Sequence, residues 1–137
     1  MTENNPKHFR FSTMKLLTHN MLTSKAIKKV TTGYPLTIEA RDVKVSEVEF
    51  NPEFVSRIIP KIDWDCLCRA AEQLGHLDDL PKTAPANYEG DEEFLKKAHH
   101  ALLEIELING SLVCPETSRK FPVSDGIPNM LLNEDEI

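Results

Sequence analysis

Glycine, cysteine and aromatic residues are all scarce in this chain of 137 residues. Its five glycines stand apart from one another, so the chain has no glycine-rich loop that could hold a phosphate or a dinucleotide. The three cysteines form an odd set without the paired spacing of a disulfide framework, which is typical of proteins in a reducing compartment.

Long apolar runs are also lacking. No stretch approaches the ~20 consecutive apolar residues that a membrane-spanning helix needs, and the N-terminus has no apolar block of the signal-peptide kind. Hydrophobic residues make up 40% of the chain and charged residues 28%, which is ordinary for a globular protein with a modest core. We therefore expect a protein of the cytoplasm and the nucleus with no membrane partner.

Positive charge is concentrated at one end. Residues 1–33 hold six Lys and Arg against one acidic residue, whereas residues 34–137 hold ten against twenty-one. Because phosphate neutralisation leads nucleic-acid binding, the acidic body should be repelled by RNA. An RNA-binding adaptor that uses the basic N-terminal segment is therefore an alternative function, and a solvated basic surface is the simpler explanation of the same residues.

The N-terminal half begins with weak signals and then alternates. Residues 1–13 are polar and aperiodic and are expected to form a flexible extension. Residues 14–22 form a short apolar element that the pattern leaves open between helix and strand. Alternation over residues 36–50 changes phase near Asp42, which predicts two strand segments with a turn or bulge between them.

Three helices are predicted next, because start and stop signals recur around stripes of apolar residues. These signals are Asn51-Pro52 and Pro60 for the first helix, Asp63 and Gly75 for the second, and the acids 91–93 and Asn109-Gly110 for the third. The predicted architecture is therefore α+β. Residues 14–50 and 109–137 form one β subdomain, and residues 51–108 are inserted as a helical subdomain.

The C-terminal portion is predicted to form three short antiparallel strands. Asn109-Gly110 and Asp125-Gly126 are dipeptides that accept positive φ, and short apolar runs lie between and after them. The third run covers residues 127–132. Its Pro128 has no N–H to give to a ladder, which places the strand at a sheet edge or beside a bulge.

This third run has apolar side chains on both faces, since Met130, Leu131 and Leu132 are consecutive and neighbours on a strand point in opposite directions. An apolar edge strand favours pairing with another chain. The pattern predicts a docking strand for a partner over residues 127–132. Cover of this strand by the chain's own helices and loops is an equally weighted alternative.

Catalytic and metal-binding motifs are not found. Adjacent residues on a helix diverge by ~100°, so His99 and His100 are poorly arranged for catalysis or chelation, and the spacing of His100 and Glu104 suits a surface pair. Cys114-Pro115 resembles half of a zinc knuckle, but the second position is Thr117, which is a poor zinc ligand. We expect no catalytic, cofactor-binding or metal residues, and an independent hydrolase or metalloenzyme is disfavoured.

Four motifs resemble a known family and occur in the family order: MKLLTHNML at 14–22, VEFNPEFVSRIIPKIDW at 48–64, EEFLKKAHHALLEIEL at 92–107 and LVCPETSRKFPVSDGIPNMLL at 112–132. On these residues the chain resembles the eukaryotic multifunctional methyltransferase-activating subunits. Members of that family are the shared small subunit of tRNA, rRNA and release-factor methyltransferases.

The resemblance implies a zinc-ribbon-like β subdomain built from both chain ends with an inserted three-helix subdomain. It further implies a non-catalytic subunit that activates and stabilises class I methyltransferases as a heterodimer, through strand pairing. S-adenosylmethionine would be bound by the partner, and RNA would be contacted only indirectly.

The same resemblance identifies the positions of interest. The four zinc cysteines of some members correspond to Ser24, Lys29, Cys114 and Thr117, so zinc is not expected here. The candidate partner-binding residues are Phe50, Ile127, Pro128, Asn129, Met130, Leu131 and Leu132.

Overall fold

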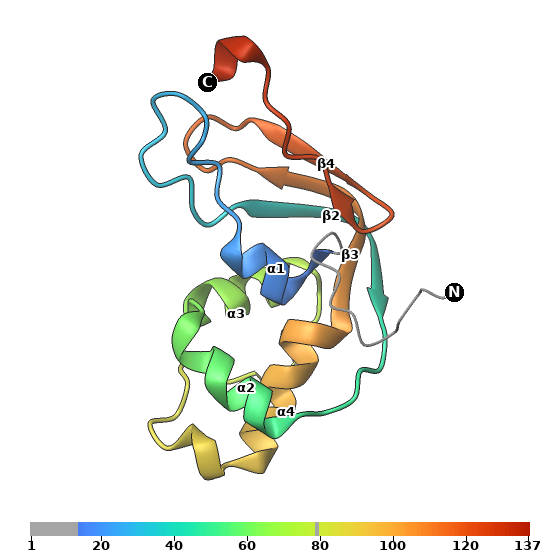
Figure 1. Ribbon diagram of the computed structural model, residues 1–137. Coiled ribbons are helices and arrows are strands. Elements are labelled where there is room, and N and C mark those ends of the chain that lie inside the picture. The colour runs from blue at the N-terminus through green and yellow to red at the C-terminus, as the bar shows by residue number, and fades with distance from the viewer. Residues whose placement is uncertain (1–13, 79) are drawn as a thin grey trace, which may run out of the picture.

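The structure is a computed structural model that describes residues 14–78 and 80–137 (Figure 1). The strands are β1 (Met14–Lys15), β2 (Thr37–Val45), β3 (Ile105–Val113), β4 (Lys120–Ser124) and β5 (Ile127–Pro128). The helices are α1 (Leu16–Met21), α2 (Pro52–Ile58), α3 (Trp64–Gln73) and α4 (Glu92–His99), with shorter helical turns at Ile59–Lys61, Tyr88–Gly90, His100–Glu104 and Glu134–Glu136. Within the described ranges, no helix has both the length and the apolar character needed to cross a membrane. The extension expected at residues 1–13 lies outside them.

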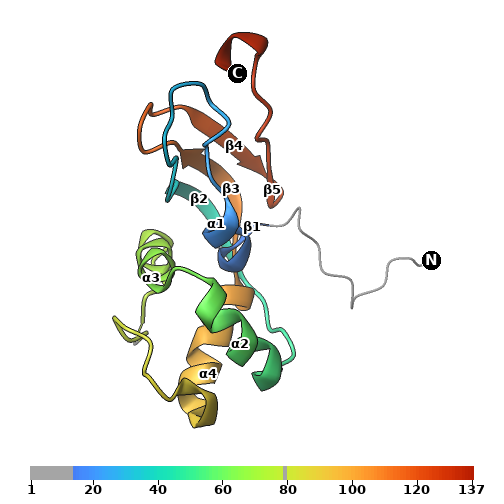
Figure 2. The same cartoon turned by 60° about the vertical axis from the view of Figure 1, so that its left-hand side comes forward.

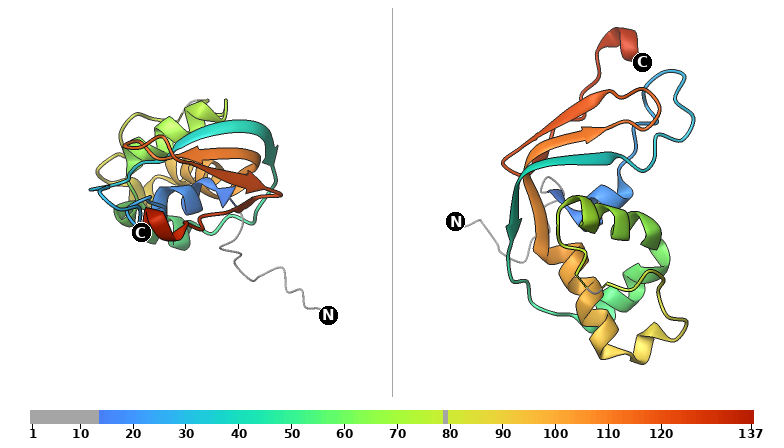
Figure 3. Two further views of the ribbon diagram at one scale, coloured as in Figure 1. Left: turned by 90° about the horizontal axis from the view of Figure 1, so that it is seen from above. Right: turned by 180° about the vertical axis from the view of Figure 1, so that it is seen from behind.

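Strand β3 is the centre of a curled antiparallel sheet. β2 pairs along one side of β3, whereas β1 and β4 pair with different stretches of its other side, and β5 follows β4 at the edge. Figure 3 shows β3 rising directly from the end of α4 and curving into the sheet. The sheet therefore joins both parts of the chain, with the helices inserted between them, and the predicted mixed α+β fold is confirmed.

The helices gather at the end of the molecule away from β4 and β5. In Figures 1 and 2, α2 and α4 lie side by side at the lower end, and α1 and α3 lie between them and the sheet. The predicted starts of two helices are confirmed. The Asn51 side chain accepts a hydrogen bond from the Phe54 N–H (3.1 Å), and the Asp63 side chain accepts one from the Cys66 N–H (3.0 Å).

Two apolar clusters stabilise this arrangement. The larger cluster lies between the inner face of the sheet and helices α1 and α3, and it includes Leu107, Leu112 and Phe121. The smaller cluster lies between α2 and α4 and centres on Val55 and Phe94. Because the larger cluster contains residues of α3 as well as of the strands, burial couples the helices to the sheet.

The third predicted helix begins at the predicted acids, since the Asp91 side chain accepts the Phe94 N–H (3.1 Å), but its predicted end and the Asn109-Gly110 turn are wrong. α4 ends at His99, continues as one π-helical turn, and gives way to β3 at Ile105. Gly110 is buried inside β3, opposite Ala40, and a Cβ at this position would collide with the backbone oxygen of Glu39. The glycine thus permits close approach of two strands, which the sequence alone cannot distinguish from a turn.

The change of phase near Asp42 is correctly predicted, but its consequence is smaller than expected. The register between β2 and β3 shifts on both sides of Asp42, so a bulge is present. The two predicted segments nevertheless form the single strand β2, which ends at Val45 rather than at Phe50. Residues 14–22, which the pattern left open, divide into the strand β1 and the helix α1.

The predicted strand over residues 127–132 is also too long. Only Ile127 and Pro128 pair as a strand, with Ser124 and Val123, and the Asn129 N–H adds a 2.9 Å hydrogen bond to the Pro122 oxygen. Beyond this point the Asn129 side chain accepts the Leu131 N–H (3.1 Å), so this N–H is used within the segment and not in a ladder with β4. The edge position predicted from Pro128 is confirmed.

Candidate docking surface

The predicted docking residues at the C-terminal end point in two directions. Met130 and Leu132 are half-buried and pack against the larger apolar cluster. By contrast, 53% of Ile127 and 79% of Leu131 is exposed, so two large apolar side chains at the sheet edge lack cover from the described residues. Pro128 is half-buried and Asn129 is exposed.

Arg119 organises the backbone around Leu131. Its guanidinium donates twice to the Glu136 carboxylate (Nε to Oε2, 2.7 Å; Nη2 to Oε1, 3.0 Å) and once to the Leu131 carbonyl (Nη2, 3.2 Å). The same group donates to the Lys120 carbonyl (2.6 Å) and lies 4.7 Å from the centre of the Phe121 ring. A single side chain thus joins β4 to the C-terminal segment.

Glu136 is fixed from other directions as well. Its backbone oxygen accepts the Lys28 N–H (2.7 Å), and its carboxylate accepts the Asn133 N–H (2.8 Å). The hydrogen bonds from Arg119, followed by the one from Asn133, lower the pKa of Glu136 to about 2. In Figures 1 and 2 the C-terminal segment accordingly lies beside the loop between α1 and β2.

Phe50 belongs to a different part of the surface. It packs against the smaller cluster, and its ring meets the His99 ring edge to face at 5.3 Å between centroids. Hollows of about 510 and 680 Å³ flank it along the segment between β2 and α2. Figure 1 shows this segment running to the lower end of the molecule, away from the C-terminal segment. The structure does not bring Phe50 together with Leu131.

The segment that carries Phe50 is anchored by Glu104 in the π-helical turn. One oxygen of the Glu104 carboxylate accepts the Val48 N–H (2.9 Å), and the other contacts His100 Nδ1 at 2.6 Å. His99 Nε2 donates to the Val48 carbonyl (2.8 Å). Burial opposes ionisation of Glu104, but the hydrogen bonds from Val48 and His100 and the two nearby imidazoles together lower its pKa. The predicted spacing of His100 and Glu104 therefore yields a real pair, with a structural role.

Three of the four positions that correspond to zinc cysteines meet at one place. Ser24 and Cys114 are buried, and the Ser24 and Thr117 hydroxyls hydrogen-bond the Cys114 thiol. Burial opposes ionisation of this thiol, but these hydroxyls and the backbone N–H groups of Glu116 and Thr117 hold its pKa below the ordinary value. Lys29, the fourth position, is exposed and has a left-handed backbone (φ 69°).

These residues do not fit a zinc ion. Structural zinc takes four ligands that are almost always thiolate or imidazole, and these four positions offer one thiol, two hydroxyls and an exposed amine. Glu116 instead joins the turn that follows Cys114 to the backbone of residues 31–33. Its carboxylate accepts the backbone N–H groups of Thr31 (3.1 Å), Thr32 (3.0 Å) and Gly33 (2.8 Å). Across residues 14–78 and 80–137, no cluster of three or more His, Cys, Asp or Glu side chains is arranged for a metal.

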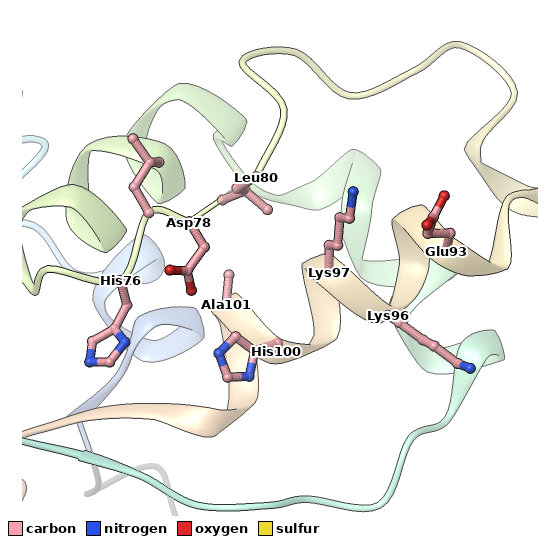
Figure 4. A pocket seen from close by; sticks show the side chains of 9 residues that line it. His76, Asp78, Leu80, Glu93, Lys96, Lys97, His100 and Ala101 are labelled. Atoms are coloured by element: carbon pink, nitrogen blue, oxygen red, sulfur yellow. The ribbon is translucent and has the colours of Figure 1, made fainter.

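A separate hollow of about 260 Å³ lies between α4 and the loop that follows α3 (Figure 4). Figure 4 shows His76 and Asp78 on the loop side, facing His100 and Ala101 on the helical side. His100 is already bonded to Glu104, which lies outside this hollow. The lining residues include no serine, threonine or cysteine.

Comparison with known proteins identifies the family. The model of a family described as "Trm112p-like protein" matches residues 15–126. The chain belongs to the Trm112p-like family. A mouse relative, described as multifunctional methyltransferase subunit TRM112-like protein, is 53% identical over 90% of this chain and 98% of its own length. The Arabidopsis thaliana TRM112 homolog A is 55% identical over 90% of this chain and all of its own length.

A solved structure supports the fold of this family member. A chain of the E. cuniculi Mtq2–Trm112 complex, described as responsible for methylating the eRF1 translation termination factor, superposes with a TM-score of 0.51. The similarity covers 86% of this chain and 95% of the solved one, at 19% sequence identity. The resemblance expected from the four sequence motifs is therefore confirmed.

Sequence reasoning missed the residues that shape the surface of this Trm112p-like protein. Arg119 and Glu136 are 17 positions apart, so no local spacing connects them. Glu116 is 83 residues from Gly33 and gave no signal either. Of the basic segment behind the RNA-binding alternative, residues 1–13 lie outside the described ranges, and Lys25, Lys28 and Lys29 are exposed in the loop after α1.

Proposed function

We propose that this chain is a non-catalytic multifunctional subunit that activates and stabilises S-adenosylmethionine-dependent methyltransferases. The observation that carries the proposal is identity above half, over nine tenths of the chain, with relatives described as multifunctional methyltransferase subunits. Its substrates, through the catalytic partners, would be tRNA, rRNA and the translation release factor. The methyltransferase would bind the cofactor and the RNA, and this subunit would form a heterodimer with it.

We further propose that the partner docks on the edge formed by β5 and the residues that follow it. Ile127 and Leu131 are exposed there, and burial of each such side chain contributes about 1.5–3 kcal/mol. The outer edge of β5 offers a place for strand pairing, with specificity from the alternating side chains. Pro128, Asn129, Met130 and Leu132 complete this surface, and Phe50 would form a second contact at the other end of the molecule.

The β part is proposed to be zinc-ribbon-like without its metal. The meeting of Ser24, Cys114 and Thr117 supports this view, as does the carboxylate of Glu116, which connects the two turns in place of an ion. We propose a division into a β subdomain of residues 14–50 and 109–137 and a helical subdomain of residues 51–108, although residues 105–108 already belong to strand β3 of the sheet. The smaller apolar cluster supports it, since all of its buried members lie between 51 and 108.

The docking proposal is tested by Leu131→Asp, with Ile137→Asp as the matched control. Both side chains are apolar and similarly exposed, at 79% and 76%, so both variants should fold normally. Each is co-expressed with the Mtq2-type methyltransferase of the same genome and purified through a tag on the catalytic subunit. We expect Leu131→Asp to be lost from the complex and Ile137→Asp to be retained. Normal recovery of folded Leu131→Asp contradicts the proposed surface.

We propose that the protein acts in the cytoplasm and the nucleus. Cys66, Cys68 and Cys114 are all free thiols, which is typical of proteins in reducing compartments. Imaging a fluorescent fusion of the full chain in cells tests this directly. We expect fluorescence in both the cytoplasm and the nucleus. Confinement of the fusion to any other compartment contradicts the proposal.

A further inference from the structure

We infer that Arg119 is a positioning residue, which holds Leu131 as a preformed apolar anchor that inserts into a concave apolar pocket of the methyltransferase. The inference rests on the proposed function and adds how one part of the surface works. It differs from pairing along the whole of residues 127–132, because it assigns Leu131 to side-chain insertion rather than to a ladder.

The first argument is that the main chain of Leu131 is already used. Its N–H donates to the Asn129 side chain (3.1 Å), and its carbonyl accepts from Arg119 (3.2 Å). A partner strand that paired through Leu131 itself would need these two groups for its own hydrogen bonds. Leu131 therefore offers its side chain alone, and this side chain is 79% exposed.

The second argument is that the anchor is held from both sides. Upstream, Met130 packs into the larger apolar cluster, and downstream Leu132 does the same. Arg119 then closes the segment through its two bonds to Glu136, and Glu136 is bonded in turn to the Lys28 N–H. The side chains of Arg119 and Glu136 are only 27% and 21% exposed, so the pair is better shielded from water than an ordinary surface ion pair.

The third argument concerns the cost of binding. A segment that must be ordered on association loses affinity in proportion to the fraction of molecules in the competent conformation. Fixing Leu131 beforehand removes that loss, and a protruding leucine needs a pocket on the other side to be buried. The chemistry that fits is an apolar pocket on the catalytic subunit, with no acidic group facing Arg119.

The test compares Arg119→Ala and Glu136→Ala with Lys120→Ala in the full chain. Lys120 is the next residue and forms an exposed pair with Glu39 (3.1 Å; 61% and 53% exposed), so it controls for the loss of a cation on β4. Affinity for the Mtq2-type methyltransferase of the same genome is measured by titration calorimetry. We expect Arg119→Ala and Glu136→Ala each to bind the methyltransferase roughly tenfold more weakly, and Lys120→Ala to bind it as the unmodified chain does.

Amide hydrogen exchange distinguishes positioning from general destabilisation. In Arg119→Ala and Glu136→Ala we expect faster amide exchange at Leu131, Asn133 and Lys28, with unchanged exchange in β3. Unchanged affinity of Arg119→Ala and Glu136→Ala, with binding still lost in Leu131→Asp, overturns the positioning role and leaves the docking surface intact. Normal binding by Leu131→Asp overturns both. If Arg119→Ala exchanges faster throughout β3, Glu136→Ala decides, since it leaves the Phe121 contact in place.

Discussion

The side chain of Asn20 and the backbone of Asp63 exchange two hydrogen bonds across 43 residues of sequence. Asn20 Nδ2 donates to the Asp63 carbonyl (2.9 Å), and its Oδ1 accepts the Asp63 N–H (2.9 Å). Asp63 in turn caps α3 through Cys66. The Tyr34 hydroxyl adds a bond to the Asn20 carbonyl (2.8 Å). One buried amide therefore fixes α1, the start of α3 and the loop before β2 relative to one another.

Asn20→Ala is expected to lower the free energy of unfolding by about 2–4 kcal/mol, because two backbone groups of Asp63 lose their partners. Asn87 is an exposed asparagine whose side chain makes no capping bond, so Asn87→Ala is the matched control and should stay within about 0.5 kcal/mol. Urea denaturation followed by circular dichroism measures both. Equal stabilities of the two variants contradict a structural role for the Asn20 amide.

The elements that sequence predicts well are those whose signals are local. The caps at Asn51 and Asp63 lie within three residues of the groups they bind, so the starts of α2 and α3 follow from short spacings. The end of α4 is different. The sequence pattern continues the helix past His99, but residues 100–104 form a π-helical turn and β3 begins directly after it. There, tertiary pairing with β2 overrides local preference.

The sequence predicted which residues form the candidate docking surface, but it did not predict the backbone conformation that exposes Leu131. The apolar run with Pro128 indicated an edge strand, and this edge is observed. The setting of Leu131, however, depends on Asn129, two residues before it, and also on Arg119, which lies 12 positions away and reaches it only in the folded chain. A pattern of alternating apolar residues carries no information on such a turn, because it assumes an extended backbone throughout.

Gly110→Ala is expected to destabilise the fold by about 1–3 kcal/mol or more. The new Cβ would collide with the Glu39 carbonyl, so β2 and β3 would have to separate at the bulge. Gly90→Ala is the control, since nothing lies within 4 Å of its added Cβ, and a change within about 0.5 kcal/mol is expected. Chemical denaturation of both variants checks the prediction, which fails if Gly110→Ala is as stable as the unmodified chain.

Glu116→Gln is expected to lower the melting temperature at neutral pH, and less so in acid. Hydrogen bonds from the backbone N–H groups of Gly33, Thr31 and Thr32 lower the pKa of Glu116 to about 2. Because the pKa is lower when folded, the ionised carboxylate stabilises the fold above its ordinary pKa of 4.5, and this contribution is lost as pH falls from 4.5 towards about 2.

The measurement for Glu116 is a pair of melting curves at each pH over that range. The difference in melting temperature between the unmodified chain and Glu116→Gln should shrink as the pH falls. Glu136, whose pKa is also about 2, is present in both proteins and cancels in the comparison. A difference that stays constant with pH contradicts the role given to the Glu116 carboxylate.

Glu104→Leu is expected to release the segment that carries Phe50. The substitution removes the acceptor of the Val48 N–H and the partner of His100, and an unsatisfied group costs about 1–3 kcal/mol. The Val48 amide should then exchange its hydrogen roughly tenfold to a hundredfold faster, because local opening becomes easier by that free energy. In the unmodified chain, the lowered pKa of Glu104 means that protection of Val48 is complete above the ordinary pKa and declines as the carboxylate is protonated.

The control for Glu104 is Glu92→Leu. Glu92 forms an exposed pair with Lys96 on α4 (3.4 Å; 71% and 61% exposed) and has the same four-residue spacing as Glu104 and His100. Such exposed pairs contribute little, so exchange at Val48 should be unchanged in this variant. Equal exchange rates in the two variants would mean that packing against His99 alone holds the segment. A further outcome is that Glu104→Leu leaves hydrogen exchange at the Leu131 amide unchanged and still weakens methyltransferase binding. In that case the Phe50 region acts as a second contact that is independent of Leu131.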